Sequence, residues 1–270
     1  MSHLKPIILC ADDFGLNPGI SQGILNLVQQ KRLSAVSCMT NSTDFAAQAA
    51  SLLQYKDQVQ IGLHFNLTEG TLFSGEQGTP LKKLLWQSYT RRLNPAKITK
   101  ELHDQLDHFV ETFGVLPDFI DGHHHIHQLP MVGPQLLQVY EQKLRANGTY
   151  IRATYPAFSL SSHRFKTKVL ATLGGKRFQQ QLAKKRIAHN PFFSGLYHFN
   201  GDTNYRSYFR QWLTMAKPHT LIMCHPGLTN ESQDSNSASR LIEFDYFASD
   251  DFLQDCADLH IQLSPLIIKA

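Results

Sequence analysis

Side chains able to bind a metal ion or to transfer a proton lie at four places in the chain, each at the end of a predicted strand. These places read ADDFG at residues 11–15, GLHFN at 62–66, DGHHHIH at 121–127 and MCHPG at 223–227. Taken singly, each has an ordinary explanation, such as a helix cap or a turn. In barrels and open α/β sheets, however, parallel strands end at one face, where active sites form. We therefore expect the four segments to meet in one site.

The sharpest of these signals is a cluster of four histidines between His123 and His127. Neighbouring imidazoles repel one another once protonated, and a divalent cation that keeps them neutral explains such a cluster. If the strand continues beyond Gly122, His123, His125 and His127 share one face; if a helix begins there, His123 and His127 share it. We select His123 as the ligand because it is nearest the strand end, with Asp121 orienting a ring from behind.

Two histidines and one carboxylate, completed by water, make a coordination site that stays open to a substrate. Imidazole favours zinc, but the sequence leaves Mg²⁺ and Zn²⁺ both open, so we expect one divalent metal cation. Such a cation lowers the pKa of bound water to about 7 and polarises a carbonyl, which supports hydrolysis of an amide or ester. Of the adjacent Asp12 and Asp13, one is expected to bind the metal and the other to accept a proton, while His225 is placed to protonate the departing amine.

The elements that position these residues alternate between short β-type runs and longer helical patterns, which favours an α/β fold around a mostly parallel sheet. Seven strands are predicted, at residues 4–11, 34–40, 59–66, 118–121, 150–153, 219–224 and 261–263. Helices are predicted at residues 19–30, 44–54, 98–113, 130–145, 205–215 and 241–259. This pattern favours a single domain over residues 1–270, folded as a distorted or incomplete (β/α) TIM-like barrel rather than as an open doubly wound sheet.

Two segments do not fit this repeat, and a third is a polar loop. Residues 68–95 and 159–200 are long for connections and are interpreted as functional loops, lids or inserted helices, the second as an insertion. Residues 229–239 are polar and low in complexity, as in a surface loop or an active-site loop. The insertion also contains a basic run over residues 176–186, which is typical of a solvated helix face; a nucleic-acid-binding module is the alternative interpretation.

The composition indicates a globular protein rather than a disordered or membrane-spanning chain. Of the 270 residues, 42% are hydrophobic and 18% are charged, and no apolar run approaches the roughly 20 residues that cross a bilayer. The net charge is only +4, and the four cysteines lack metal-ligand spacing, so we expect reduced thiols. We expect a cytoplasmic protein without a nucleic-acid or membrane partner, and we leave a homodimer open.

Taken together and in this order, the four motifs resemble those of the YdjC-like carbohydrate deacetylases along most of the chain. The resemblance implies a distorted (β/α) barrel and metal-dependent removal of acetyl groups from sugars that contain N-acetylglucosamine. It also implies metal ligation by Asp13, His64 and His123, with Asp12 as the base and His225 as the acid.

Two further residues are assigned to binding of the substrate, an acetylated amino sugar or oligosaccharide. Arg152 lies in the predicted strand over residues 150–153, where it would bind substrate, orient a carboxylate or form a structural salt bridge. His127 is expected to face the same site as His123. A metal-dependent phosphoesterase with the same ligands is the main alternative function, although the sequence has no Gly-rich phosphate loop.

Overall fold

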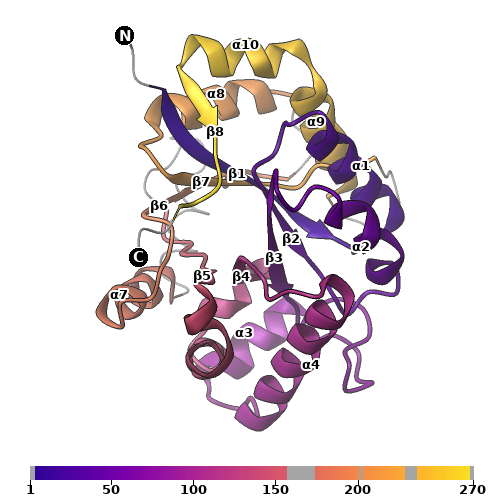
Figure 1. Ribbon diagram of the computed structural model, residues 1–270. Coiled ribbons are helices and arrows are strands. Elements are labelled where there is room, and N and C mark those ends of the chain that lie inside the picture. Colours follow the sequence, from indigo (N-terminus) through magenta and orange to yellow (C-terminus); the bar gives the residue numbers. More distant parts are fainter. Residues whose placement is uncertain (1–3, 157–173, 200, 202, 229–235, 268–270) are drawn as a thin grey trace.

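The centre of the protein is a curled sheet of parallel strands that forms an incomplete barrel. The computed structural model describes residues 4–156, 174–199, 201, 203–228 and 236–267 (Figure 1). Its strands are β1 (Lys5–Phe14), β2 (Ala35–Cys38), β3 (Gln60–Phe65), β4 (Phe119–Gly122), β5 (Tyr150–Ile151), β6 (Phe192–Ser194), β7 (Thr220–Cys224) and β8 (Ile261–Leu263). They follow the order β5-β4-β3-β2-β1-β7-β6, and β8 pairs with the first residues of β1. The predicted fold class is confirmed.

The edge strands β5 and β6 approach each other without a continuous ladder. The Ile151 amide donates to the Ala188 carbonyl at 2.9 Å, and an isolated parallel bridge joins Pro156 to Phe193. Strand β6 lies inside the segment predicted as an insertion over residues 159–200, of which residues 157–173 fall outside the described part. The sequence pattern missed this strand, because the surrounding segment over residues 159–200 did not fit the repeat of strands and helices. The insertion therefore supplies an edge strand of the barrel.

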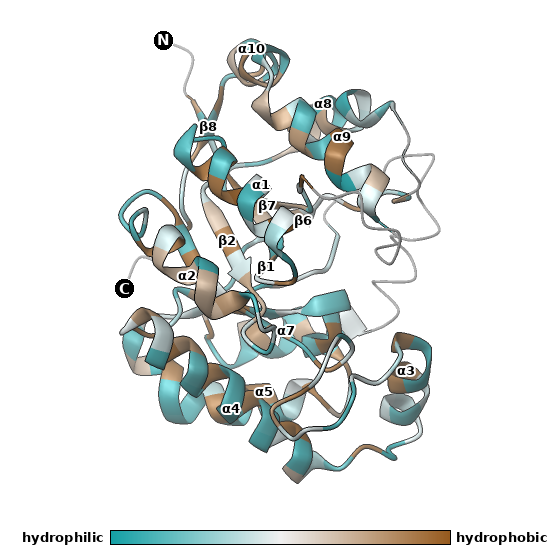
Figure 2. Cartoon of the chain, turned by 90° about the vertical axis from the view of Figure 1, so that its right-hand side faces the viewer, coloured by the Kyte–Doolittle hydropathy of each residue, from teal (hydrophilic) through white to brown (hydrophobic). Residues whose placement is uncertain are grey.

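Helices surround the sheet, and Figure 2 shows that they mix hydrophilic and hydrophobic residues, as helices that cover a sheet do. They are α1 (Pro18–Gln29), α2 (Phe45–Leu53), α3 (Leu81–Tyr89), α4 (Pro95–Phe113), α5 (Gly133–Val139), α7 (Lys176–Lys184), α8 (Tyr205–Met215), α9 (Ser237–Ala248) and α10 (Asp250–Asp258). The start of α1 follows from the sequence, because Asn17 accepts a hydrogen bond from the Ile20 amide and Pro18 occupies the first turn. Helix α4 begins in the same way, at Asn94.

Two predicted helices differ from the observed ones. The helix predicted over residues 241–259 is two helices, because Ser249 is extended at the junction and its side chain caps α10. The helix predicted over residues 130–145 begins only at Gly133, then widens into a π-helical turn (Tyr140–Leu144) and a 3₁₀ turn (Arg145–Asn147). The segment predicted as a loop over residues 229–239 ends in the first turn of α9, and its residues 229–235 lie outside the described part.

The long connection over residues 68–95 folds into a turn followed by α3. An isolated bridge joins Thr71 to Gln77, and Glu101 of α4 accepts hydrogen bonds from the amides of Phe73 and Ser74 at 3.1 and 3.2 Å. One buried carboxylate thus anchors the turn to the barrel.

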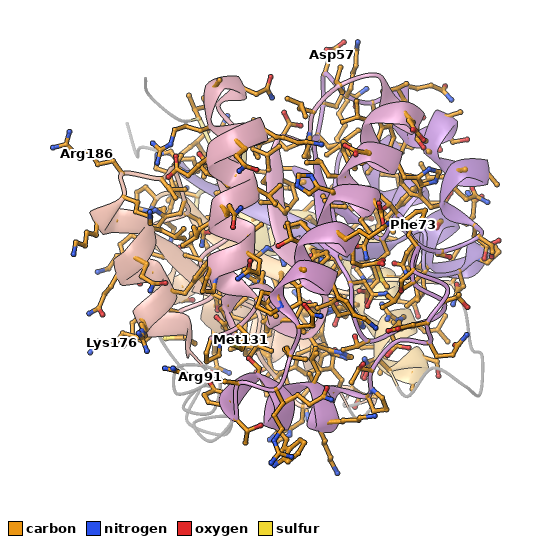
Figure 3. All side chains as sticks on the ribbon, turned by 90° about the horizontal axis from the view of Figure 1, so that it is seen from below. Asp57, Phe73, Arg91, Met131, Lys176 and Arg186 are labelled. Atoms are coloured by element: carbon orange, nitrogen blue, oxygen red, sulfur yellow. The ribbon has the colours of Figure 1, made fainter. Side chains whose placement is uncertain are left out.

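Helix α7 has the amphipathic pattern predicted for the basic run. Phe178 and Leu182 are buried, whereas the lysines and arginines of residues 176–186 are exposed. Lys176 and Arg186 project from the periphery of the molecule in Figure 3. Across the described ranges, no helix is both long enough and apolar enough to span a bilayer.

The carboxyl ends of β1, β3, β4 and β7 carry the four polar segments. Strands β3 and β4 pair in register, which places His64 beside Asp121. Strands β1 and β7 pair up to Ala11 and Cys224, so the residues that follow these two also lie close together. The sheet therefore brings the four segments to one end of the barrel.

Candidate metal centre and active site

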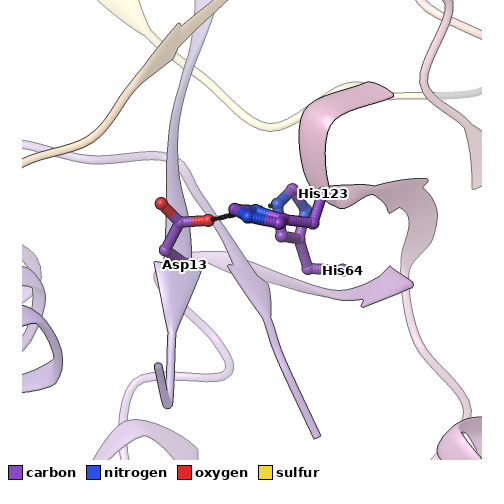
Figure 4. A group of neighbouring side chains, drawn as sticks. All are labelled: Asp13, His64 and His123. Carbon is purple, nitrogen blue, oxygen red and sulfur yellow. Dashed lines mark hydrogen bonds and ion pairs between the residues drawn. The ribbon is translucent and has the colours of Figure 1, made fainter. Parts of the chain in front are cut away.

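Side chains from three strand ends meet around one point (Figure 4). Asp13 Oδ1 lies 3.0 Å from His123 Nδ1 and 3.3 Å from His64 Nε2. Ligand atoms of the three residues lie within 4.8 Å of one another, and all three residues are buried. These are the residues predicted from the sequence as metal ligands, and the structure brings them together.

A bulge in β1 lets two adjacent aspartates reach this site. Successive residues of a regular strand point to opposite faces of a sheet. The pairing of β1 with β2 runs from Ala11 beside Val36 to Phe14 beside Cys38, so β1 contains one residue more than its partner. Asp13 has a left-handed φ of 72° within this bulge. Bulges redirect side chains in this way, and both Asp12 and Asp13 are buried as a result.

The donor set fits a divalent cation. His64 Nδ1 lies 2.6 Å from Asp121 Oδ1, and the Ser37 hydroxyl donates to the same carboxylate oxygen at 2.7 Å. A hydrogen bond from Nδ1 to this carboxylate orients the ring so that Nε2 faces Asp13, where a cation can replace the Nε2 proton, the arrangement common for histidine ligands. Two imidazole nitrogens and one carboxylate oxygen, with positions left for water and substrate, suit Zn²⁺ and, with more waters, Mg²⁺.

The surrounding carboxylates control the protonation of His64. Burial lowers the pKa of the His64 imidazole, but Asp121 and then Asp13 outweigh burial and raise this pKa to about 10. A cation bound at Nε2 would displace the proton, so metal binding at this site is coupled to proton release.

Asp12 lies beside this cluster and is held by Arg152. Its two carboxylate oxygens each accept a hydrogen bond from the guanidinium at 2.7 Å, and Arg152 Nη2 also lies 2.7 Å from Asp121 Oδ2. Burial raises the pKa of Asp12, but the Arg152 charge outweighs burial and holds this pKa below its ordinary value. Arg152 is fully buried and has no surface for the expected contact with sugar. Its contacts agree with both alternatives, orientation of a carboxylate and a structural salt bridge.

His225 follows β7 and lies next to Asp12. Its Nε2 is 4.0 Å from Asp12 Oδ2, and the ring packs edge-on against Phe199 with 4.9 Å between centroids. The backbone amide of His225 donates to Glu243 Oε2 at 2.5 Å. Burial lowers the pKa of the His225 imidazole to about 4, although Asp13 and Asp12 oppose this shift. The ring is therefore neutral at pH 7 and must gain a proton before it can act as an acid.

The histidine cluster neither extends β4 nor forms an α-helix, so both geometries expected for it are wrong. Residues His123–Gln128 form a short 3₁₀ helix in which His124 and His125 have left-handed φ values of 52° and 58°. This turn places His127 Nε2 3.0 Å from the carbonyl oxygen of Arg152. His127 is fully buried and has no surface for the substrate contact expected of it.

The sequence pattern does not identify three further charged residues at the site. Arg240 of α9 donates to Asp13 Oδ2 at 2.7 Å, and Glu243 of the same helix is fully buried. Glu69 Oε1 lies 3.9 Å from His123 Nε2 on a partly exposed side chain. Arg240 and Glu243 are three residues apart, a spacing that usually indicates an ion pair on a helix surface. Only the packing of α9 against the strand ends shows that they point inward.

The motifs and the fold match a known family. The model of the family described as YdjC-like protein matches residues 6–258. The chain belongs to the YdjC-like family. This match includes all four polar segments at the strand ends.

Curated relatives of this YdjC-like chain include two named chitooligosaccharide deacetylase. The Proteus mirabilis (strain HI4320) protein is 34% identical over 148 residues, which cover 53% of this chain and 57% of the relative. The Enterobacter sp. (strain 638) protein is 33% identical over 144 residues, covering 52% and 57%. The chain therefore spans a little over half the length of these relatives. A candidate cellobiose-phosphate cleavage protein from Enterococcus faecalis V583 has TM-score 0.73 at 18% identity over 98% of both chains, a likeness that shows the fold alone.

Proposed function

We propose that this YdjC-like chain is a metal-dependent carbohydrate N-deacetylase, a hydrolase that removes acetyl groups from sugars containing N-acetylglucosamine. The observation that carries this proposal is the cluster of Asp13, His64 and His123, with Asp12 beside it and His225 4.0 Å from Asp12. The name shared by the two relatives supports an acetylated amino sugar or oligosaccharide as the substrate.

Asp13, His64 and His123 would hold one divalent cation, Mg²⁺ or Zn²⁺. Such an ion would supply Lewis-acid polarisation of the acetamide carbonyl, and Zn²⁺ would also lower the pKa of water to about 7. The chain itself fixes the ligands. Asp121 orients the His64 ring, and Arg240 occupies the Asp13 oxygen that does not face the histidines. One oxygen of Asp13 thereby stays directed at the site.

Asp12 and His225 would move the protons. Arg152 binds both oxygens of Asp12, so this carboxylate stays ionised and oriented to accept a proton from the attacking water. His225, with its pKa lowered by burial to about 4, starts neutral. It would receive this proton across the 4.0 Å between Nε2 and Asp12 Oδ2 and donate it to the departing amine. One proton thus passes from water to nitrogen, as amide hydrolysis requires.

Acetate release from N-acetylglucosamine oligomers tests the proposal. We expect release in the presence of Mg²⁺ or Zn²⁺, loss of release after treatment with a chelator, and recovery when the metal is added back. Phosphate release from phosphorylated sugars, measured in parallel, tests the phosphoesterase alternative. A protein that releases phosphate but no acetate would contradict the proposed function.

A further inference from the structure

The turn that carries His225 is tied to helix α9 at three points. The His225 amide donates to Glu243 Oε2 at 2.5 Å, and the His225 carbonyl oxygen accepts from Arg240 Nη1 at 3.5 Å. The Gly227 amide donates to the Arg240 carbonyl at 3.2 Å. The pairing of β7 with β1 ends at Cys224, one residue before this turn. Helix α9 therefore holds the turn where the sheet no longer does.

The carboxylate of Glu243 is buried at a free-energy cost, so it is not there to stabilise helix α9. Glu243 is fully buried, and its second oxygen accepts a hydrogen bond from the Tyr197 hydroxyl at 2.6 Å. Removing a carboxylate from water is costly, and burial raises the pKa of Glu243 to about 7. Apolar residues of similar volume often fill such buried positions with equal or greater stability. What the carboxylate supplies at this position is two acceptor oxygens, one for the His225 amide and one for the Tyr197 hydroxyl.

The His225 amide is one of the groups that need an acceptor. A buried amide beyond the end of a ladder must find a partner, and Glu243 supplies it. Loss of this partner would let the turn shift toward another acceptor. Misplacement by about 1 Å of a group that acts in a reaction costs about 100-fold in rate. The imidazole of His225 would move with its backbone, away from its position near Asp12.

We infer that Glu243 is a positioning residue that holds the backbone amide of His225 and so keeps the imidazole within reach of Asp12. This inference rests on the proposed role of His225 in proton transfer. Glu243 acts through the backbone of His225 and is not itself a catalytic residue.

Two substitutions separate the hydrogen bond from the charge. Glu243→Gln keeps an oxygen for the His225 amide and can donate its NH₂ group to the Tyr197 hydroxyl oxygen, so we expect kcat within about threefold of the unsubstituted protein. Glu243→Met has a similar length and no acceptor. We expect it to lower kcat for acetate release about 10- to 100-fold, with KM and metal affinity changed less than about twofold.

Asp255→Asn is the matched control. Asp255 of α10 is a fully buried carboxylate that accepts a hydrogen bond from the Tyr246 hydroxyl at 2.9 Å, as Glu243 does from Tyr197. Its guanidinium partners are Arg206 and Arg210 of α8. We expect this variant to lower Tm and to leave kcat of the folded protein unchanged.

Amide hydrogen exchange gives a readout that does not depend on activity. We expect the His225 amide to be protected in the unsubstituted and Glu243→Gln proteins and to exchange at least about tenfold faster in Glu243→Met. If the Met variant does not fold, Glu243→Asp, which is one methylene too short for the same contact, should lose kcat to the same extent.

Two results would overturn the inference: equal loss of kcat in the Gln and Met variants, or unchanged kcat in the Met and Asp variants. If the unsubstituted protein releases no acetate, the proposed function fails instead. The exchange rates alone then decide whether Glu243 holds His225 in place.

Discussion

The two adjacent aspartates of this chain have different partners, which supports different roles for them. Asp12 accepts hydrogen bonds from Arg152 at both carboxylate oxygens. Asp13 accepts from Arg240 at one oxygen only, and its other oxygen faces the two histidines. Within the part of the chain that the structure describes, the Asp13 oxygen that faces the histidines has no guanidinium partner, so it is directed at the point where the ligand atoms meet. The geometry therefore supports Asp13 as the ligand independently of family resemblance, whereas the role of Asp12 as the base rests on the proposed function.

Removing either proposed histidine ligand should abolish acetate release without unfolding the protein. His64→Ala and His123→Ala each delete one of three ligand side chains. We expect each to weaken metal affinity more than the roughly 10- to 100-fold that loss of a supporting contact costs. Metal titration by calorimetry, circular dichroism and an acetate assay measure the three effects. His103→Ala, in α4, is the control, and unchanged turnover in both site variants would contradict the metal-hydrolase proposal.

Residues that follow strands could be predicted as site residues from the sequence, whereas residues that reach the site from helices could not. His64 and His225 follow buried apolar runs, so fold topology alone brings them together. Arg240 and Glu243 lie within a helix, and nothing in their spacing shows that α9 packs against these strand ends. The position of His127 could not be derived from the sequence, because two consecutive left-handed residues turn the chain in a way that no periodicity shows.

Among the helices and strands, the sequence predicts best those whose first or last residues carry a recognisable cap, such as an asparagine followed by a proline. Helix α1 begins with an asparagine cap and a proline, and its predicted and observed ranges nearly coincide. Strand β6 is defined by its pairing with β7, and the sequence pattern did not separate it from the long segment over residues 159–200. The break at Ser249 does have a signal, a serine followed by Asp250 and Asp251, but helical periodicity continues across it and hides the boundary.

Helix α1 packs so closely on the turn after β7 that it limits the size of a side chain. A Cβ on Gly23 would lie 2.8 Å from Gly227 Cα and 3.0 Å from the Leu228 amide nitrogen. Both are backbone atoms that cannot rotate aside, so in Gly23→Ala the helix or the turn must move. We expect a loss of about 1–3 kcal/mol in the free energy of unfolding, measured with denaturant, and a lower kcat because this turn carries His225.

Gln22→Ala, at an exposed position of the same helix, is the control for helix propensity and should leave both values near those of the unsubstituted protein. A Gly23→Ala protein with unchanged stability and unchanged kcat would show that the turn after β7 can move to make room for the methyl group at no cost. In that case the position of the turn would not limit the reaction.

At the scale of the whole molecule, the alternation of strands and helices was enough to predict the barrel. Short buried strands separated by helices are compatible with only a few α/β folds. The contribution of the insertion to the barrel was not predictable, since it depends on a bridge between distant segments. A single domain, a cytoplasmic location and a homodimer remain predictions.

At one end of the barrel, buried carboxylates outnumber buried guanidiniums. Three buried carboxylates and two buried guanidiniums contribute: Asp12, Asp13, Asp121, Arg152 and Arg240. Before the histidines and Glu243, whose pKa burial raises to about 7, are counted, these five residues carry one net negative charge. The raised pKa of His64, about 10, adds a compensating proton, and a divalent cation can replace that proton.

A cation bound at this site should stabilise the whole chain, and more so at higher pH. Binding to the folded form alone adds about 2.7 kcal/mol when the metal concentration is 100 times Kd. Because the pKa of His64 is raised from 6.5 to about 10, its proton stabilises the fold fully below about pH 6.5, and this contribution is lost as pH rises toward 10. The same proton competes with the metal. Competition therefore weakens with rising pH, and the contribution of the metal grows.

Scanning calorimetry with and without Mg²⁺ or Zn²⁺ measures this coupling. We expect the metal to raise Tm more at about pH 8.5 than at about pH 6.5, and to raise it little in His64→Ala, because the protein then lacks both the ligand and the competing proton. A rise in Tm that is equally large in His64→Ala, or one that grows as pH falls, would place the stabilising cation somewhere other than among Asp13, His64 and His123.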